Sequence, residues 1–206
     1  MIYKNKSDLL RAHIKSNDIV LDVGFLGQGI KENDQRWPHF IIKKFAKDVY
    51  GIDLEISPEY KQNPHYLEAS AENFSFPVKF DVIFAGDLIE HLSNPGLFLD
   101  CCKKHLKPNG KLILTTPNTF NLFNLTEKLS KREPTVNPDH TFYFNSKTLT
   151  KLLEKNGIKK SEVNFLYTLG YEHKESWKKK LLNMLYSFLA LFTDKFIETL
   201  VIIATL

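Results

Sequence analysis

The segment VLDVGFLGQG, residues 20–29, constrains the fold of this chain more than any other. A short apolar run ends at Asp22 and is followed by Gly24, Gly27 and Gly29. An apolar run that stops at an acid and turns through glycines is typical of a buried parallel strand that leads into a loop lined by backbone amides. Glycine has no Cβ, so the loop can adopt left-handed angles and let a ligand approach its backbone. We therefore expect a nucleotide-type pocket after this strand.

A second apolar run, VYGIDLEI, places Asp53 at the end of the next strand. In α/β nucleotide-binding folds an acid at this position binds ribose hydroxyls. The helix between the two strands is expected to open near Pro38, because proline is favoured in a first helical turn. The segment 30–37 before that helix is interpreted as an insertion. Together the two strands and the helix predict a right-handed βαβ unit.

Strands and helices alternate along the rest of the chain, which predicts an α/β fold with a doubly wound, mostly parallel sheet and helices on both faces. Ser7, Asn94 and Ser146 are each expected to cap a helix. The segment 117–145 has no uninterrupted amphipathic period, and we expect it to be a loop that covers the ligand site. Further strands are expected at residues 65–68, 80–85, 111–116, 163–167 and 199–204, which gives seven strands in all.

Length and charge limit the function further. The chain has 206 residues, which suits a single domain over residues 1–206. Its net charge is +4, with basic and acidic residues interspersed, so nucleic acid is an unlikely partner. Cys101 and Cys102 are adjacent, which disfavours a disulfide between them and suggests that both are reduced.

Two terminal segments bear on location. Residues 1–18 have no long apolar core and no small-residue cleavage site, so we expect no signal peptide and a cytoplasmic protein. Residues 181–192, LLNMLYSFLALF, are apolar all round, but they are shorter than the roughly 20 residues that span a membrane. They predict a buried helix, with peripheral membrane contact as the alternative.

Six segments, taken in order, resemble the class I S-adenosylmethionine-dependent methyltransferases. The resemblance covers nearly the whole chain, from Ser7 to Ala204, and implies the family's Rossmann-like seven-stranded sheet with an antiparallel last strand. It also implies S-adenosylmethionine as the cofactor. The segments are VLDVGFLGQG, GIDLE, SAENF, FDVIFAGDLIEHLSNPGLFL, LKPNGKLILTTPN and HTFYFNSKTLTKLLEKNGI.

The same resemblance implies which residues bind the cofactor. The glycines of the first loop would line its methionine part, Asp53 would bind the ribose diol, and Gly86 would lie beside the sulfonium. Two positions depart from the family pattern. Leu26 stands where the middle glycine of G-x-G-x-G is usual, and Ser70 replaces an acid that accepts from adenine, so Glu72 or a main-chain group is expected to substitute. The full set of expected cofactor residues is Asp22, Gly24, Gly27, Gly29, Asp53, Leu54, Ser70, Ala71 and Gly86.

The methyl acceptor needs a lone pair held in line with the sulfonium methyl, with water excluded. A hydroxyl acceptor would also need a base. The candidates are Asp87, Glu90, His91 and His140. Acid-x-x-Glu-His is similar to an element that holds a divalent ion in some ubiquinone-pathway and small-RNA O-methyltransferases, where a downstream histidine completes the site. A metal is thus an alternative, placed behind hydrogen-bonding or base roles for the two histidines.

The acceptor itself is left open as a small molecule, a sugar or a lipid, and the oligomeric state is also open. The aromatic residues of the covering segment are interpreted first as ordinary core, and contact with a flat ring or a sugar face is the alternative. The altered glycine loop supports a non-catalytic scaffold or partner subunit, whereas Asp22, Asp53 and the acid-rich turn at residues 87–91 oppose it. An NAD-dependent oxidoreductase is disfavoured because Leu26 stands where the backbone must approach a pyrophosphate. The aromatic residues are Phe120, Phe123, Phe142, Tyr143 and Phe144.

Overall fold

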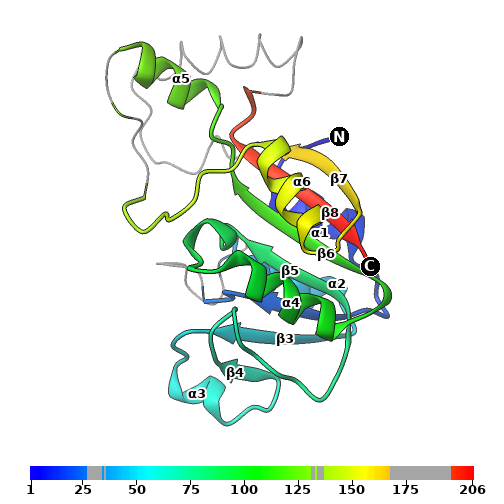
Figure 1. Ribbon diagram of the computed structural model, residues 1–206. Helices are drawn as coiled ribbons and strands as arrows, with labels where there is room; N and C mark the ends of the chain where they lie inside the picture. Colours follow the sequence, from blue (N-terminus) through cyan, green and yellow to red (C-terminus); the bar gives the residue numbers. More distant parts are fainter. Residues whose placement is uncertain (27–33, 35, 131–132, 134–136, 168–195) are drawn as a thin grey trace.

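A computed structural model describes residues 1–26, 34, 36–130, 133, 137–167 and 196–206. Figure 1 shows strands and helices alternating along the chain around one sheet. The strands are β1 (Ile2–Tyr3), β2 (Ile19–Val23), β3 (Asp48–Asp53), β4 (Tyr66–Glu68), β5 (Phe80–Gly86), β6 (Leu106–Pro117), β7 (Lys160–Leu166) and β8 (Thr199–Thr205). The helices are α1 (Lys6–His13), α2 (Pro38–Phe45), α3 (Pro58–Lys61), the 3₁₀ helix η1 (Ile89–His91), α4 (Pro95–His105), α5 (Leu122–Leu129) and α6 (Ser146–Lys155).

The sheet has the order β1-β7-β8-β6-β5-β2-β3-β4. Only β8 runs antiparallel to its neighbours, β6 and β7, whereas all the other pairs are parallel. The predicted α/β class and the antiparallel last strand are therefore confirmed, and the seven predicted strands are all present in a sheet of eight. The eighth strand, β1, was not expected, because two residues beside β7 are too short to show a periodic pattern.

Helices cover both faces of the sheet, as the doubly wound prediction requires. In Figure 1, α4 and α6 lie in front of the sheet and α1 and α2 lie behind it. One core cluster joins the sheet to α4 and α6 through residues such as Phe98 and Leu149. The second cluster joins it to α1 and α2 through Leu10 and Ile42. Burial of these apolar faces supplies the main driving force for the layered fold.

The helix starts follow local sequence signals, with two corrections. Asn5, and not Ser7, caps α1, because its side chain accepts a hydrogen bond from the Asp8 amide at 2.8 Å. Asn145, and not Ser146, caps α6, where it forms a capping box with Thr148. Asparagine is as good an N-cap as serine, so the sequence alone did not rank the adjacent candidates correctly. Pro38 in the first turn of α2 and Asn94 before α4 agree with the predictions.

The segment after β6 also differs from expectation, because it contains a helix. Asn121 caps α5 by accepting from the Asn124 amide at 3.0 Å, and Leu122, Leu125 and Leu129 follow at helical spacing. The segment is rich in asparagine and threonine, so the sequence alone does not distinguish Asn121 as the capping residue. In Figure 1, α5 stands away from the sheet at the upper left.

Several expectations fall outside the described residues. They are the insertion at 30–37, apart from its few described positions, the glycines at 27 and 29, and the apolar segment 181–192. Among the residues that the structure does describe, no helix has the length and the apolar character needed to cross a bilayer.

Candidate active site

The candidate site residues gather at the carboxyl ends of the central parallel strands. Val23 of β2 is paired with Ile52 of β3 and with Ala85 of β5, so the three strands end at one edge. Asp53, Gly86 and the loop after β2 thus meet there. A crevice at this edge is where doubly wound folds bind ligands.

Gly24 makes the turn that ends β2. Its φ angle is +75°, a left-handed conformation that glycine adopts without strain. Its amide donates to the Ile52 carbonyl at 2.8 Å, and a Cβ at this position would lie 3.3 Å from Leu88. A side chain here would therefore be strained both by backbone angle and by contact.

Asp53 is tied to the loop that follows β2. Its carboxylate accepts from the Leu26 amide at 2.9 Å and from the Leu54 amide at 2.8 Å. Burial raises the pKa of Asp53, and the two amide hydrogen bonds oppose that rise. Beside it, Leu54 is 71% exposed.

Asp22 lies on the buried side of the loop. It is 2% exposed, and its carboxylate is 3.1 Å from Nδ1 of the buried His39, whose Nε2 is 3.0 Å from the hydroxyl of Tyr66. The structure therefore places the Asp22 carboxylate against α2 and β4. Its visible role is to support the loop from behind.

The loop after β4 contributes the expected adenine-side residues. Ser70 accepts from the Glu72 amide at 3.1 Å, and Ala71 is buried. The carboxylate of Glu72 accepts from the Asn94 amide at 2.8 Å, at the start of α4. A Cβ on Gly86 would lie 2.8 Å from the Phe84 ring, so packing requires a glycine there. One oxygen of the Glu72 carboxylate is thus used to hold the start of α4.

Asp87 is held in a different way from the other acids of its segment. It has a left-handed φ of 51°, and its carboxylate accepts from the Lys6 ammonium at 2.7 Å and from the Thr115 hydroxyl at 3.0 Å. Burial alone would raise the pKa of Asp87, but the Lys6 ammonium and these hydrogen bonds lower it below its ordinary value. Asp87 thus serves as an anchor between α1, β6 and η1.

Glu90 is the buried acid of the site. It is 1% exposed, and its Oε2 accepts from the Thr116 hydroxyl at 2.8 Å, whereas its Oε1 has no hydrogen-bond partner among the described residues. Burial, and then the nearby Asp87 carboxylate, raise the pKa of Glu90 to about 7. A buried carboxylate oxygen without a partner is costly, which points to a ligand that completes it.

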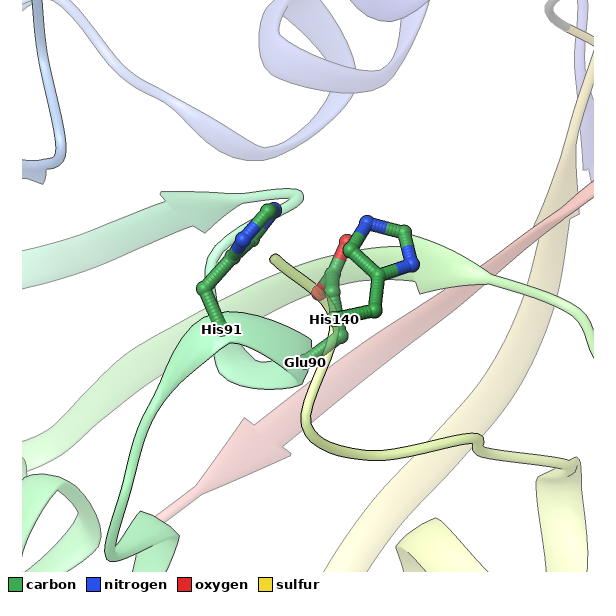
Figure 2. A group of neighbouring side chains, drawn as sticks. All are labelled: Glu90, His91 and His140. Atoms are coloured by element: carbon green, nitrogen blue, oxygen red, sulfur yellow. The ribbon is translucent and has the colours of Figure 1, made fainter. Parts of the chain in front are cut away.

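Two histidines lie beside Glu90. Figure 2 shows the side chains of His91, on η1, and His140, on the segment before α6, next to that of Glu90. Their rings are 4.6 Å apart in an edge-to-face arrangement, and one ligand atom from each of the three residues lies within 4.8 Å of the others. Burial and the neighbouring His91 lower the pKa of His140. The neutral imidazole that this favours can accept a proton or bind a metal.

Backbone hydrogen bonds bring His140 to this place. The carbonyl of Glu90 accepts from the amides of Thr141 at 2.8 Å and Phe142 at 3.1 Å, and from the Thr141 hydroxyl at 3.0 Å. The sequence suggested that Asp87, Glu90 and His91 would share one helical face. The group found in the structure is instead Glu90, His91 and His140, because η1 begins after Asp87 and Lys6 holds the Asp87 carboxylate.

Glu90 and His140 open on a small polar cavity of about 200 Å³. A larger, mainly apolar cavity of about 800 Å³ adjoins it, since both are lined by Thr119, Asn124 and Tyr143. The sequence did not single out Lys6, Thr116 or Asn124, because no motif marks their partners. The smaller cavity is lined by Glu90, Thr116, Pro117, Thr119, Asn121, Asn124, Asn137, His140, Phe142 and Tyr143.

Comparisons with known proteins agree with this architecture. A relative, the ubiquinone biosynthesis O-methyltransferase of Aliivibrio fischeri strain MJ11, is 26% identical over 164 residues, covering 72% of this chain and 67% of the relative. The human mitochondrial ubiquinone biosynthesis O-methyltransferase is 34% identical over 102 residues, which cover 46% of this chain and 28% of that protein. The chain thus matches less than a third of the human enzyme.

A solved structure shows a similar fold, and a family model assigns the family. A methyltransferase dependent on S-adenosylmethionine from Archaeoglobus fulgidus has a similar fold, with a TM-score of 0.63, 17% identity and coverage of 98% of this chain and 92% of that one. The family model described as "Methyltransferase domain" matches residues 2–163. Because this match covers more than half of the chain, the chain belongs to the class I S-adenosylmethionine-dependent methyltransferase family.

Proposed function

We propose that this protein transfers the methyl group of S-adenosylmethionine to a hydroxyl group of a small-molecule acceptor. The observation that carries the proposal is the buried Glu90 carboxylate, whose Oε1 lacks a partner among the described residues while the side chain lines a polar cavity. The relatives named O-methyltransferases support oxygen as the acceptor atom. An amine acceptor is the less favoured alternative.

The cofactor would lie across the ends of β2, β3 and β5. The residues there fit it, because Gly24 makes a left-handed turn at the end of β2 and Asp53 presents a carboxylate at the end of β3. The exposed Leu54 offers an apolar surface next to Asp53. S-adenosylmethionine supplies an activated methyl group, so the chain's own residues need only hold the acceptor in line and exclude water.

Glu90 would act as the base. The acceptor hydroxyl would bind at the free Oε1, and Glu90 would take its proton as the oxygen lone pair bonds to the methyl carbon. S-adenosylmethionine would supply the methyl group, and S-adenosylhomocysteine would leave with the electron pair of the broken carbon–sulfur bond. The raised pKa of Glu90, about 7, suits proton transfer near neutral pH. Thr116 would orient the carboxylate through its hydrogen bond to Oε2.

A divalent ion is the second candidate arrangement. Glu90, His91 and His140 bring one carboxylate and two imidazoles within 4.8 Å, a donor set that fits a transition metal or zinc better than calcium. When bound, such an ion would lower the pKa of an acceptor hydroxyl. In that case Glu90 and the histidines would bind the ion, and Thr116 would still orient Glu90.

The acceptor class stays broad. The polar cavity suits hydroxyl groups, and the adjoining apolar cavity could take a ring or a chain, so a sugar, a lipid or another small molecule is compatible with the two. Membrane contact through residues 181–192 lies outside the described residues and stays a prediction. The family assignment gives no support to the NAD-dependent reading, and the Glu90 site argues against a purely structural role.

The test is a search for product with labelled methyl donor and metabolite extracts, followed by turnover of Glu90→Gln. We expect the label on an oxygen atom and a fall in kcat of about 10²- to 10⁴-fold in Glu90→Gln. Glu154→Gln, on the exposed side of α6, is the matched control and should keep full activity. Label on nitrogen, or full turnover by Glu90→Gln, would contradict the proposal.

The same assay separates the two arrangements. After dialysis against a chelator, activity that persists supports Glu90 as base, whereas activity that is lost and returns with one divalent metal supports the ion. Absence of any turnover, together with unchanged thermal stability in S-adenosylhomocysteine, would favour the scaffold reading.

A further inference from the structure

The loop after β2 departs from the family's glycine pattern, and Phe25 follows its first glycine. A bulky aromatic residue would normally obstruct a loop that must lie close to a ligand. Here the side chain of Phe25 is only 2% exposed and turns into the core. It belongs to a separate apolar cluster with Trp37, Ile56 and Tyr66.

Gly51 makes room for this ring. A Cβ on Gly51, in the middle of β3, would lie 2.7 Å from Cδ1 of Phe25 and 2.9 Å from Cδ1 of Tyr66. Glycine inside a strand weakens it and commonly marks a place where another group approaches closely. The absence of a side chain at Gly51 therefore leaves a space that the Phe25 ring fills, and we call this space the seat of Phe25.

Three rings surround Phe25 in that seat. Ring centroids of His39, Tyr66 and Tyr60 lie 4.9, 5.0 and 5.2 Å from that of Phe25. His39 is fully buried and is fixed at both ring nitrogens, by Asp22 and by the Tyr66 hydroxyl. The seat is thus rigid, because its polar groups are paired and its rings are packed.

The backbone of the same turn is fixed as well. The Trp37 indole N–H donates to the Phe25 carbonyl, and the Phe25 amide donates to the Ile52 carbonyl at 3.4 Å. The next amide, that of Leu26, donates to Asp53 at 2.9 Å. Movement of Phe25 would therefore move both the loop backbone and the acid expected to hold the ribose.

We infer that Phe25 is a positioning residue for the methyl donor: seated against Gly51 and held by Trp37 and the Asp22-His39-Tyr66 network, it presets the first turn of the cofactor loop. The inference rests on the proposed placement of the cofactor at this loop. It also gives Asp22 a role, which is to fix His39 rather than to touch the ligand. Preorganised loops bind more tightly because less ordering is left to the binding step.

The test uses three variants that disturb the packing or hydrogen bonding around Phe25, and one matched control. Gly51→Ala crowds the Phe25 ring, Trp37→Phe removes the indole N–H, and Tyr66→Phe removes one hydroxyl bonded to a buried histidine. Tyr3→Phe is the control, because the Tyr3 hydroxyl also bonds a histidine, His13, at 2.7 Å, far from the loop. The readouts are the Kd for S-adenosylhomocysteine by calorimetry and the midpoint of thermal unfolding.

We expect S-adenosylhomocysteine to bind about tenfold more weakly to Gly51→Ala and about fivefold more weakly to Trp37→Phe and Tyr66→Phe. Tyr3→Phe should lose a similar amount of stability and keep its Kd within about twofold. If Gly51→Ala does not fold, the other two variants decide. Unchanged Kd in Trp37→Phe and Tyr66→Phe, or an equal loss in Tyr3→Phe, would overturn the inference.

Asp53→Ala tells this outcome apart from failure of the cofactor placement. If Asp53→Ala weakens binding while the seat variants do not, the placement stands and the role of Phe25 falls. If none of these variants changes the Kd, the cofactor does not lie at this loop and both are wrong.

Discussion

On the cofactor side of the site, at the loop after β2, buried rings surround Phe25 and support the loop. On the acceptor side, in the segment 117–145, helix α5 instead exposes Leu125 and Leu129. Backbone hydrogen bonds to the Glu90 carbonyl and the bridge between Asn118 and Phe144 help to join the acceptor side to the rest of the protein. Segments with few buried apolar contacts open at lower cost than core segments. The comparison suggests a cofactor site that is set before binding and an acceptor site that adapts to its ligand.

The largest expected effect on the cofactor side comes from a substitution at the start of its loop. Gly24→Val places a β-branched residue at a φ of +75°, 3.3 Å from Leu88. A valine there would carry about 2 kcal/mol of backbone strain. Relief of this strain should move the loop out of the conformation that binds the cofactor, and the affinity for S-adenosylhomocysteine should fall about 30-fold. Calorimetry measures this loss, and circular dichroism should show a folded chain. Wild-type affinity in the folded variant would mean that this turn is not part of the cofactor site.

A second prediction sharpens the acceptor side through pH. The pKa of Glu90 in the folded protein, about 7, is above its ordinary value of 4.5, so the folded state binds more protons than the unfolded state between these values. Stability of chelator-treated protein should therefore fall as pH rises through this window, by a few kcal/mol at most. Glu90→Gln should lack that fall. Urea unfolding at pH 5 and pH 8 measures the difference in unfolding free energy between the two pH values. An equal difference in the wild type and in Glu90→Gln would refute the shifted pKa.

The positions on the cofactor side could be predicted from the sequence more readily than those on the acceptor side, for physical reasons. Asp53 and Gly24 follow from a strand pattern and a glycine turn, which are local signals. The contacts of Lys6 with Asp87 and of Asp22 with His39 join residues far apart in the chain, so no spacing rule reveals them. His140 was placed by resemblance alone, because only the fold brings it beside Glu90.

The smallest expected effect concerns the proposed cover, residues 117–145. Trypsin should cut first after Lys128, which lies on α5 between exposed leucines, and later in α2, where Lys43 and Lys44 lie over aromatic rings. S-adenosylhomocysteine together with the acceptor found by labelling should slow the first cut severalfold. Mass spectrometry identifies the cut. Equal cutting with and without the ligands would count against a cover that closes.

The most direct test of the division into cofactor and acceptor sides is calorimetric titration of S-adenosylhomocysteine into Asp53→Ala and Glu90→Gln. We predict that Asp53→Ala loses about 1.5 to 3 kcal/mol of binding free energy, the usual value for hydrogen bonds to a charged group. Glu90→Gln should bind as tightly as the wild type, because its carboxylate belongs to the acceptor cavity. Unchanged affinity in Asp53→Ala, or an equal loss in Glu90→Gln, would contradict the account.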